Sequence, residues 1–244
     1  MQVRLDKALV ERGLASTRSR AQLMIRSGAI LINERLVEKP SHLIKTEDVV
    51  RILWEVNPWV SRGGLKLEYA IAAFKLAPLK GIAIDIGAST GGFTEVLLAY
   101  GCSKVYAIDV GKDQLNLKLK DDPRVQNIEG VNAKKLNTIN LPFVDLIVCD
   151  VSFISISKAL KVPLIYAKNN CQLIALIKPQ FEVGPGKVGK RGIVNDLKFQ
   201  QEACVSTQSF LLQEGWSVNS LKKSPILGSD GNLEFLISAN KIAK

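Results

Sequence analysis

The pattern of apolar and polar positions predicts an α/β domain over most of this chain. Apolar runs suited to strands buried on both faces of a parallel sheet lie at residues 82–86, 104–109, 125–128, 144–150 and 171–178. Segments with the apolar spacing of helices occupy residues 65–74, 114–119 and 195–213. This alternation favours a doubly wound, Rossmann-like sheet. The segments 216–218 and 232–237 are expected to form an antiparallel terminal strand pair.

The first 53 residues have a different pattern and predict a small α+β domain. Helices are expected over residues 4–12 and 17–27, because Gly13 and Gly28 follow them as stop signals. Short strands are expected at 29–32, 36–37 and 49–53. The composition changes after Trp54, and Asn57-Pro58 interrupts any regular element. We therefore expect one domain over residues 1–60 and a second over 61–244.

Composition narrows the class of partner and of site. The chain has 244 residues, of which 47% are hydrophobic, and a formal net charge of +10, which favours a polyanionic partner. Its four cysteines are far apart and it has one histidine, so we expect no metal site and no disulfides. Reduced thiols favour a cytoplasmic protein. No apolar run approaches the ~20 residues that span a bilayer, so we expect no membrane association.

The stretch 82–98 suits a ligand that approaches bare backbone. Asp85 ends the first apolar run, and a turn of small residues leads into a helix at Phe93; this turn contains Gly87, Ser89, Thr90, Gly91 and Gly92. Glycines before a helix N-terminus let a ligand reach backbone N–H groups. The spacing differs from the dinucleotide pattern G-x-G-x-x-G, which favours a cofactor without a pyrophosphate.

Polar side chains at the ends of two later strands extend this site. Asp109 lies 24 positions after Asp85, near the offset at which an acid binds ribose hydroxyls in doubly wound folds. Asp85 is expected beside the polar end of the cofactor, and Asn132 lies where an adenine edge is often read. This pattern resembles the S-adenosyl-L-methionine motifs of class I methyltransferases. The resemblance implies that these three residues, the turn and Phe93 bind that cofactor.

Residues 2–53 resemble the S-four-type RNA-binding domain. The matching residues are Arg4-Leu5-Asp6, Leu9, Ser19-Arg20, Ala21, Ile25, Gly28, Ile30, Asn33 and Asp48. The resemblance implies that RNA phosphates contact four arginines of this domain, namely Arg4, Arg18, Arg20 and Arg26. A solvated helix face explains any one of these arginines, but it does not explain the group.

Motifs in both domains resemble the TlyA family, which is also labelled haemolysin A. They lie at residues 61–67, 85–94, 149–155, 178–182 and 188–190. Members of this family join an S-four-type domain to an FtsJ-like methyltransferase domain and methylate ribose 2′-oxygens of ribosomal RNA. The resemblance implies a class I methyltransferase fold, S-adenosyl-L-methionine as cofactor, and ribosomal RNA or ribosomal subunits as partner.

The same resemblance implies a catalytic tetrad of Lys66, Asp150, Lys178 and Glu234. A ribose hydroxyl is a poor nucleophile, so a base must take its proton as the methyl group moves. Lys178 is expected to be this base and Lys66 a second cation, while the two acids orient the ammonium groups and the hydroxyl. Taken singly, Lys66 in the first turn of its helix and Glu234 in an alternating strand are expected to be solvated.

Other functions have less support in the residues. The prolines typical of base N-methylation are missing from 150–153, and Cys149 is expected to point away from the site, which disfavours carbon methylation. A membrane-active cytolysin would need an amphipathic or spanning segment, and a non-catalytic RNA-binding protein would not need the tetrad. The basic loop at 184–192 either closes over RNA or is a solvated connector.

Overall fold

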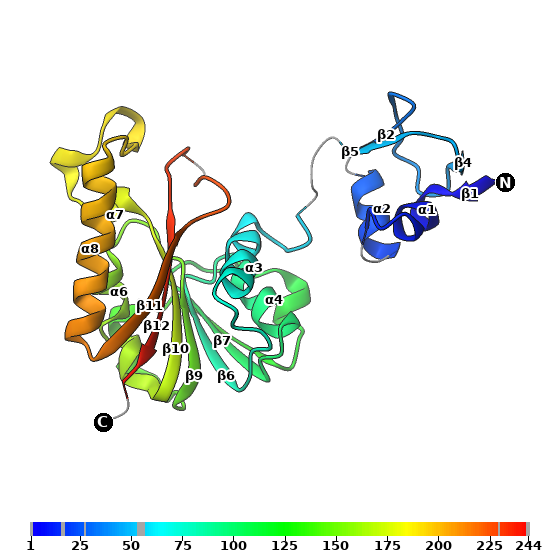
Figure 1. Ribbon diagram of the computed structural model, residues 1–244. Coiled ribbons are helices and arrows are strands. Elements are labelled where there is room, and N and C mark those ends of the chain that lie inside the picture. The colour runs from blue at the N-terminus through cyan, green and yellow to red at the C-terminus, as the bar shows by residue number, and fades with distance from the viewer. Residues whose placement is uncertain (1, 16–17, 27, 53–56, 229, 243–244) are drawn as a thin grey trace. The chain divides into compact units, whose positions relative to one another are not determined.

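Figure 1 shows the computed structural model of the chain, which describes residues 2–15, 18–26, 28–52, 57–228 and 230–242. The chain divides into two compact units, Met1–Pro58 and Trp59–Lys244. Each unit has a hydrophobic core of its own.

The N-terminal unit packs two helices, α1 (Leu5–Glu11) and α2 (Arg18–Arg26), against short strands. An antiparallel sheet has the order β3-β2-β5, formed by β3 (Arg35–Leu36), β2 (Ile30–Ile32) and β5 (Val50–Ile52). Its core contains Leu5, Leu9, Ile25, Ile30 and Ile44. The apolar pattern did not predict the pairing of β1 (Gln2–Arg4) with β4 (Leu43–Lys45). Strands of three residues are too short to show an alternation in the sequence.

The C-terminal unit contains a seven-stranded sheet in the order β11-β12-β10-β9-β6-β7-β8. Its strands are β6 (Ile82–Ile86), β7 (Lys104–Asp109), β8 (Val125–Glu129), β9 (Val144–Cys149), β10 (Ala167–Ile177), β11 (Trp216–Lys223) and β12 (Phe235–Lys241). The first five are parallel, whereas β12 is antiparallel to both β10 and β11. The predicted doubly wound sheet with an antiparallel terminal pair is confirmed.

Helices cover both faces of this sheet (Figure 1). One face packs against α3 (Arg62–Ala73), α4 (Gly92–Ala99) and α5 (Leu117–Lys120). The other packs against η1 (Ala133–Thr138), α6 (Ile156–Leu160), η2 (Pro163–Tyr166) and α8 (Leu197–Gln213). Successive residues of β9 alternate between the two cores, because strand side chains point to opposite faces. Burial on both faces explains why the strands read as unbroken apolar runs.

The parallel topology brings distant segments of the chain to one edge of the sheet. Strands β6, β7, β9 and β10 all end there, so the turn after Ile86 meets Asp109, Asp150 and Lys178. Beyond β10 the chain continues through α7 (Pro179–Glu182), η3 (Pro185–Lys187) and η4 (Lys190–Gly192) before α8. In open α/β sheets, ligands bind at this carboxyl edge.

Candidate active site

The glycine turn after β6 is packed so closely that side chains are excluded. Gly87 has a φ of 85°, and a Cβ there would lie 2.3 Å from the backbone oxygen of Asp150. A Cβ on Gly92 would lie 2.1 Å from the hydroxyl oxygen of Ser61. Both distances are far below a van der Waals contact, so only glycine fits these positions. The turn is therefore packed between the residue that follows β9 and the N-terminus of α3.

Two pockets open beside this turn and share part of their walls. The first has a volume of about 530 Å³ and is lined by residues that include Ile108, Asp109, Val131, Asn132 and Phe153. The second, of about 200 Å³, is lined by residues that include Ser61, Thr90, Gly92, Phe93 and Lys178. Gly87, Ser89, Asp150 and Ser152 line both. The two pockets are therefore neighbouring parts of one cleft at the carboxyl edge of the sheet.

Asp109 is held at the wall of the first pocket by backbone groups. Its two carboxylate oxygens accept hydrogen bonds from the N–H of Ser89 at 2.8 Å and of Gly111 at 2.7 Å. Each oxygen keeps a second lone pair, so the carboxylate can still accept from a pair of hydroxyl groups. Asn132 lines the same pocket, while its side-chain oxygen caps η1 by accepting from the N–H of Lys134.

Two residues predicted to bind the cofactor line neither pocket. Asp85 is 0% exposed, and one of its oxygens accepts a hydrogen bond from the hydroxyl of Thr94 at 2.7 Å. Its Oδ1 has no hydrogen-bond partner among the described residues, and burial raises the pKa of this carboxyl to about 7. Gly91 has a φ of 96° and precedes α4, where a Cβ would collide with Leu119. The conformation of the turn therefore requires a glycine at position 91.

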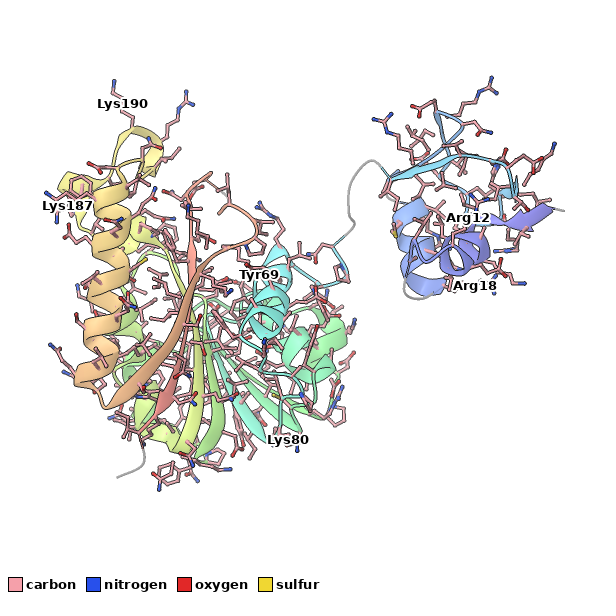
Figure 2. All side chains as sticks on the ribbon, in the orientation of Figure 1. Arg12, Arg18, Tyr69, Lys80, Lys187 and Lys190 are labelled. Atoms are coloured by element: carbon pink, nitrogen blue, oxygen red, sulfur yellow. The ribbon has the colours of Figure 1, made fainter. Side chains whose placement is uncertain are left out.

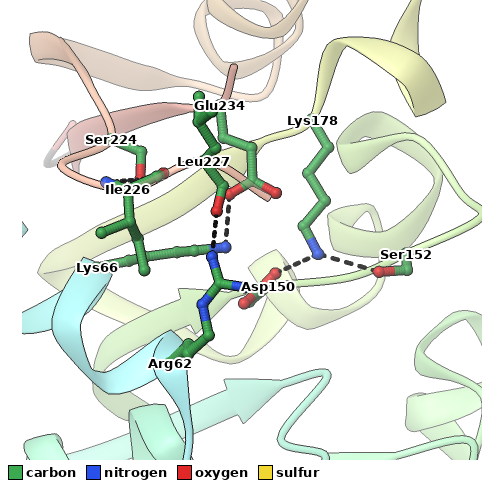
Figure 3. Close-up of polar contacts among 9 residues, drawn as sticks. All are labelled: Arg62, Lys66, Asp150, Ser152, Lys178, Ser224, Ile226, Leu227 and Glu234. Atoms are coloured by element: carbon green, nitrogen blue, oxygen red, sulfur yellow. Dashed lines mark hydrogen bonds and ion pairs between the residues drawn. The ribbon is translucent and has the colours of Figure 1, made fainter. Parts of the chain in front are cut away.

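Lys178 stands at the rim of the second pocket, directly after β10. Its ammonium group forms an ion pair with Asp150 Oδ1 at 2.6 Å and donates a hydrogen bond to the Ser152 hydroxyl at 3.0 Å (Figure 3). These partners follow β9, which is the parallel neighbour of β10. Both charged side chains are mostly buried. The parallel register thus sets a lysine beside a carboxylate at the mouth of the cleft.

The other predicted pair, Lys66 and Glu234, is buried, so the expectation that each is solvated is wrong. Lys66 is 7% exposed, Glu234 is 2% exposed, and their charged atoms are 2.5 Å apart (Figure 3). Glu234 directly precedes β12 and does not lie inside the strand. Alternation therefore does not apply to it, and its carboxylate turns inward to meet the lysine of α3. Pairing compensates for the desolvation of both charges.

The loop between β11 and β12 contacts the start of α3 at a second point. Arg62 donates a hydrogen bond of 2.7 Å to the backbone oxygen of Leu227, and its exposed side chain lies beside Lys66 in Figure 3. Because α3 begins at Arg62, Lys66 lies in its second turn and not in the first turn as expected, and the N-terminal part of the helix presents two cations to a loop that supplies one carboxylate. Sequence reasoning did not select Arg62, although it lies inside the motif at 61–67.

Three further residues of the cleft were missed by residue-by-residue reasoning. Ser61 and Ser152 line its walls, and Phe153 extends from it with 91% of its surface exposed and a φ of 65°. The ring of Phe153 packs against Phe181 with centroids 5.1 Å apart. A left-handed conformation is uncommon for an aromatic residue and often marks a functional site. The available signal for Ser152 and Phe153 was their position directly after a strand that ends in an acid, and for Ser61 it was its place in the motif at 61–67.

Two arginines of the N-terminal unit, Arg4 and Arg18, form hydrogen bonds to a buried acid. Asp6 is 0% exposed and accepts hydrogen bonds from Arg4, Arg18 and Gln22. Hydrogen bonds from Arg4, Gln22 and Arg18 hold the pKa of this carboxyl well below its usual range, although burial opposes them. Arg4, Arg18 and Arg26 remain exposed at the surface, while the side chain of Arg20 lies outside the described residues. Arg18 is labelled in Figure 2.

Neither a metal site nor a membrane-spanning helix occurs among the described residues. They contain no group of three or more histidine, cysteine or acidic side chains placed to hold a metal ion. Over the same residues, no helix has the length and apolar character needed to cross a membrane.

Comparison with known proteins identifies both units. A model of the FtsJ-like methyltransferase family matches residues 59–241, and a model of the S4 domain matches residues 3–50. Hemolysin A of Brachyspira hyodysenteriae is 41% identical over 238 residues, which are 96% of this chain and 98% of that protein. The 16S/23S rRNA (cytidine-2′-O)-methyltransferase TlyA of Mycobacterium tuberculosis is 38% identical over 236 residues, or 96% of this chain and 88% of that protein.

A solved structure supports the same assignment. A candidate hemolysin from Streptococcus thermophilus aligns with a TM-score of 0.75 and 37% identity, covering 100% of this chain and 90% of that one. The chain therefore belongs to the TlyA (hemolysin A) family of FtsJ-like methyltransferases, with an S4 domain before its methyltransferase domain.

Proposed function

We propose that this protein transfers a methyl group from S-adenosyl-L-methionine to a ribose 2′-oxygen of ribosomal RNA. The observation that carries the proposal is the position of Lys178. This lysine is paired with Asp150 and lines the same cleft as the glycine turn and Asp109. A proton acceptor and a cofactor site thus share one space, as in-line transfer to a hydroxyl requires.

The residues of the cleft fit this cofactor. Asp109 faces the first pocket and suits the ribose hydroxyls, while Ile108 and Val131 offer apolar walls to an adenine, and Asn132 lies beside them. The turn of Gly87, Ser89, Thr90, Gly91 and Gly92 leads to the second pocket, toward which the methionine end would extend. Beneath this turn, one buried oxygen of Asp85 has no hydrogen-bond partner in the part of the chain that the structure describes, so an ammonium group nearby would stabilise its charged form.

When bound, the cofactor supplies an electrophilic methyl group on a sulfonium. In its neutral amine form Lys178 takes the proton of the attacking 2′-hydroxyl, and it becomes the ammonium that Asp150 and Ser152 hold by the contacts seen in the structure. Lys66 and Glu234 line neither pocket, and we assign to their buried ion pair the role of orienting the ribose through its opposite charges. Fixing the oxygen in line with the methyl group accounts for much of the expected acceleration. The four residues of the tetrad therefore have distinct roles.

Two observations favour transfer to oxygen over transfer to carbon. Carbon methylation of a pyrimidine requires a thiolate nucleophile. Cys149 is fully buried inside β9, and burial raises the pKa of its thiol well above the usual range. It is therefore inert. The M. tuberculosis relative, which is named as a cytidine-2′-O-methyltransferase, supports the same choice.

Ribosomal RNA is proposed as substrate because both units carry features that suit it. The N-terminal unit belongs to the S4 domain family and presents Arg4, Arg18 and Arg26 at its surface. The net charge of +10 favours binding to a polyanion. We include Arg20 in this RNA-binding group on the sequence alone. The M. tuberculosis relative is named for action on 16S and 23S rRNA.

The proposal is tested by incubating the protein with isolated small and large ribosomal subunits and methyl-tritiated S-adenosyl-L-methionine. The subunits come from a strain that lacks this protein, and subunits from the matched strain that contains it are the control. We expect label only in the former, located at a ribose whose phosphodiester bond resists alkaline hydrolysis. Label on a base, or none on either subunit, would contradict the proposal.

A further inference from the structure

The catalytic role proposed for Glu234 requires that a long loop be held in one place. Glu234 lies at the end of the segment that joins β11 to β12, and residue 229 of this segment lies outside the described residues. Its carboxylate crosses to Lys66 on α3. A Cβ on Gly228 would lie 2.6 Å from Glu234 Oε1, so the loop itself packs against the carboxylate.

Asn232 lies two residues before Glu234 and is only 1% exposed. Its side-chain oxygen accepts a hydrogen bond from the N–H of Val194 at 2.9 Å, and its side-chain nitrogen donates to the oxygen of Gly192 at 2.9 Å. Its backbone oxygen accepts from the N–H of Gly228, also at 2.9 Å. Asn232 thus closes its own loop through its backbone oxygen, and its side-chain amide joins this loop to a segment 40 residues away.

Asn232 holds the C-terminal end of the basic loop at 184–192 through Gly192, and it also holds Val194 just beyond it. This loop follows Lys178 and α7. Gln200 of α8 donates from its side chain to the oxygen of Val194 at 2.8 Å and is itself 7% exposed. The exposed cations Lys190 and Arg191 belong to this loop, and Figure 2 shows Lys190 extending away from the protein. Its backbone is therefore anchored from α8 on one side and from the Glu234 loop on the other.

We propose that Asn232 is a positioning residue that sets Glu234 opposite Lys66 by joining the Glu234 loop to the basic loop. The inference rests on the proposed function, in which Glu234 belongs to the tetrad. A buried amide with both ends hydrogen-bonded specifies one arrangement, because any shift leaves a donor or an acceptor unpaired. RNA phosphates bound at Lys190 and Arg191 would shift the basic loop. Its hydrogen bonds to Asn232 would pass this shift to the position of Glu234.

The test measures single-turnover methylation of ribosomal subunits by Asn232→Ala, Glu234→Gln and the double variant. Asn232→Asp is included because it keeps the volume and the acceptor but places an oxygen against the Gly192 oxygen. Thr207→Val is the matched control, since Thr207 is equally buried but bonds only to Ala203 in its own helix. S-adenosyl-L-methionine affinity of every variant is measured by calorimetry.

We expect each single substitution at Asn232 to lower the methylation rate by roughly 10–100-fold, part of the effect of losing a positioned catalytic group. Cofactor affinity should change less than about threefold. In the Glu234→Gln background, Asn232→Ala should reduce the rate by less than about twofold, because groups that act as one unit are not additive. Thr207→Val should leave the rate unchanged.

Two outcomes would overturn the inference, and they are distinguishable. A full Asn232→Ala effect in the Glu234→Gln background would show that Asn232 acts by another route, while the tetrad would stand. A wild-type rate in Glu234→Gln itself would remove Glu234 from the tetrad and this role of Asn232 with it. If Asn232→Ala fails to fold, Asn232→Asp alone and combined with Glu234→Gln supplies the same cycle.

Discussion

Each unit of this protein buries one aspartate completely, and the two differ in what surrounds them. Asp6 in the N-terminal unit receives hydrogen bonds from two arginines and a glutamine, and its pKa lies well below the usual range. Asp85 in the methyltransferase unit accepts a hydrogen bond from the Thr94 hydroxyl, and its other carboxylate oxygen has no partner among the described residues. Burial raises the pKa of Asp85 to about 7. Equal burial has opposite electrostatic consequences.

The different surroundings of Asp6 and Asp85 indicate how each unit is suited to the ligand proposed for it. In the N-terminal unit the acid is satisfied by the protein, and the arginines around it are held in place with donors still facing outward. In the methyltransferase unit one oxygen of the buried carboxylate has no hydrogen-bond partner among the described residues, and it lies below the turn that we propose binds the cofactor. These surroundings suit the functions proposed above, in which the first unit binds RNA and the second binds a cofactor and carries out methyl transfer.

The largest expected effect comes from Lys178, which separates chemistry from binding. Lys178→Ala and Lys178→Arg should both fold and bind S-adenosyl-L-methionine, while single-turnover methylation falls by about 10²–10⁴-fold in each. Arginine cannot accept the proton because it stays protonated in proteins. Lys80→Ala is the control, since Lys80 is exposed before β6, at the opposite edge of the sheet. A near wild-type rate for the arginine variant across pH would assign the proton to another group.

A smaller effect is expected at Asp109, which sharpens the cofactor half of the comparison. Asp109→Ala should weaken S-adenosyl-L-methionine binding by roughly 10–100-fold, the value of hydrogen bonds to a charged group. The substitution also removes the acceptor for the Ser89 N–H that holds the turn. Calorimetry measures the affinity, and Asp113→Ala, a neighbouring exposed aspartate, is the control. Unchanged affinity in Asp109→Ala would remove this residue from the site.

The arginines of the N-terminal unit test its half of the comparison. The double variant Arg18→Ala/Arg26→Ala should bind ribosomal subunits less tightly and lower the slope of log affinity against log salt by roughly 1.5. Arg12→Ala is the contrast, because Arg12 donates to the backbone oxygens of Lys45, Thr46 and Asp48 and is expected to act on stability. Equal slopes for the wild type and the double variant would identify these arginines as a solvated surface.

The smallest effect concerns stability against pH and compares the two aspartates directly. Because the pKa of Asp85 is raised to about 7, its contribution to stability is fully present below about pH 4 and is lost as the pH rises through 7. Asp85→Asn should therefore flatten the fall in unfolding free energy over this range. Urea unfolding followed by the fluorescence of buried Trp216 measures it.

Asp6→Asn serves as the control in this experiment. The pKa of Asp6 is lowered, so its contribution is present above about pH 4 and is lost only as the pH falls further. Since Asp6 lies in the other unit, its substitution should leave the Trp216 transition unchanged between pH 4 and 8. A Trp216 transition whose pH dependence survives in Asp85→Asn would assign the slope to another group.

The sequence by itself determined the strands and the order of charges along them. Apolar runs predicted β6, β7, β9 and β10, because strands buried on both faces must be apolar throughout. Parallel strands end at one edge, so the sequence also placed Asp109, Asp150 and Lys178 near one another. What it fixed was local: a run of residues and the charge at its end.

Only the tertiary structure decided which charges are buried and which groups they meet. Lys66 and Glu234 lie 168 positions apart, and each considered alone is suited to solvent. Asn232 gave no signal, because its partners lie in a loop 38 to 40 positions earlier. Burial of a charge depends on whether a partner of opposite sign is also removed from water. That partner is supplied by the packing of α3 against the loop before β12, which no local pattern contains.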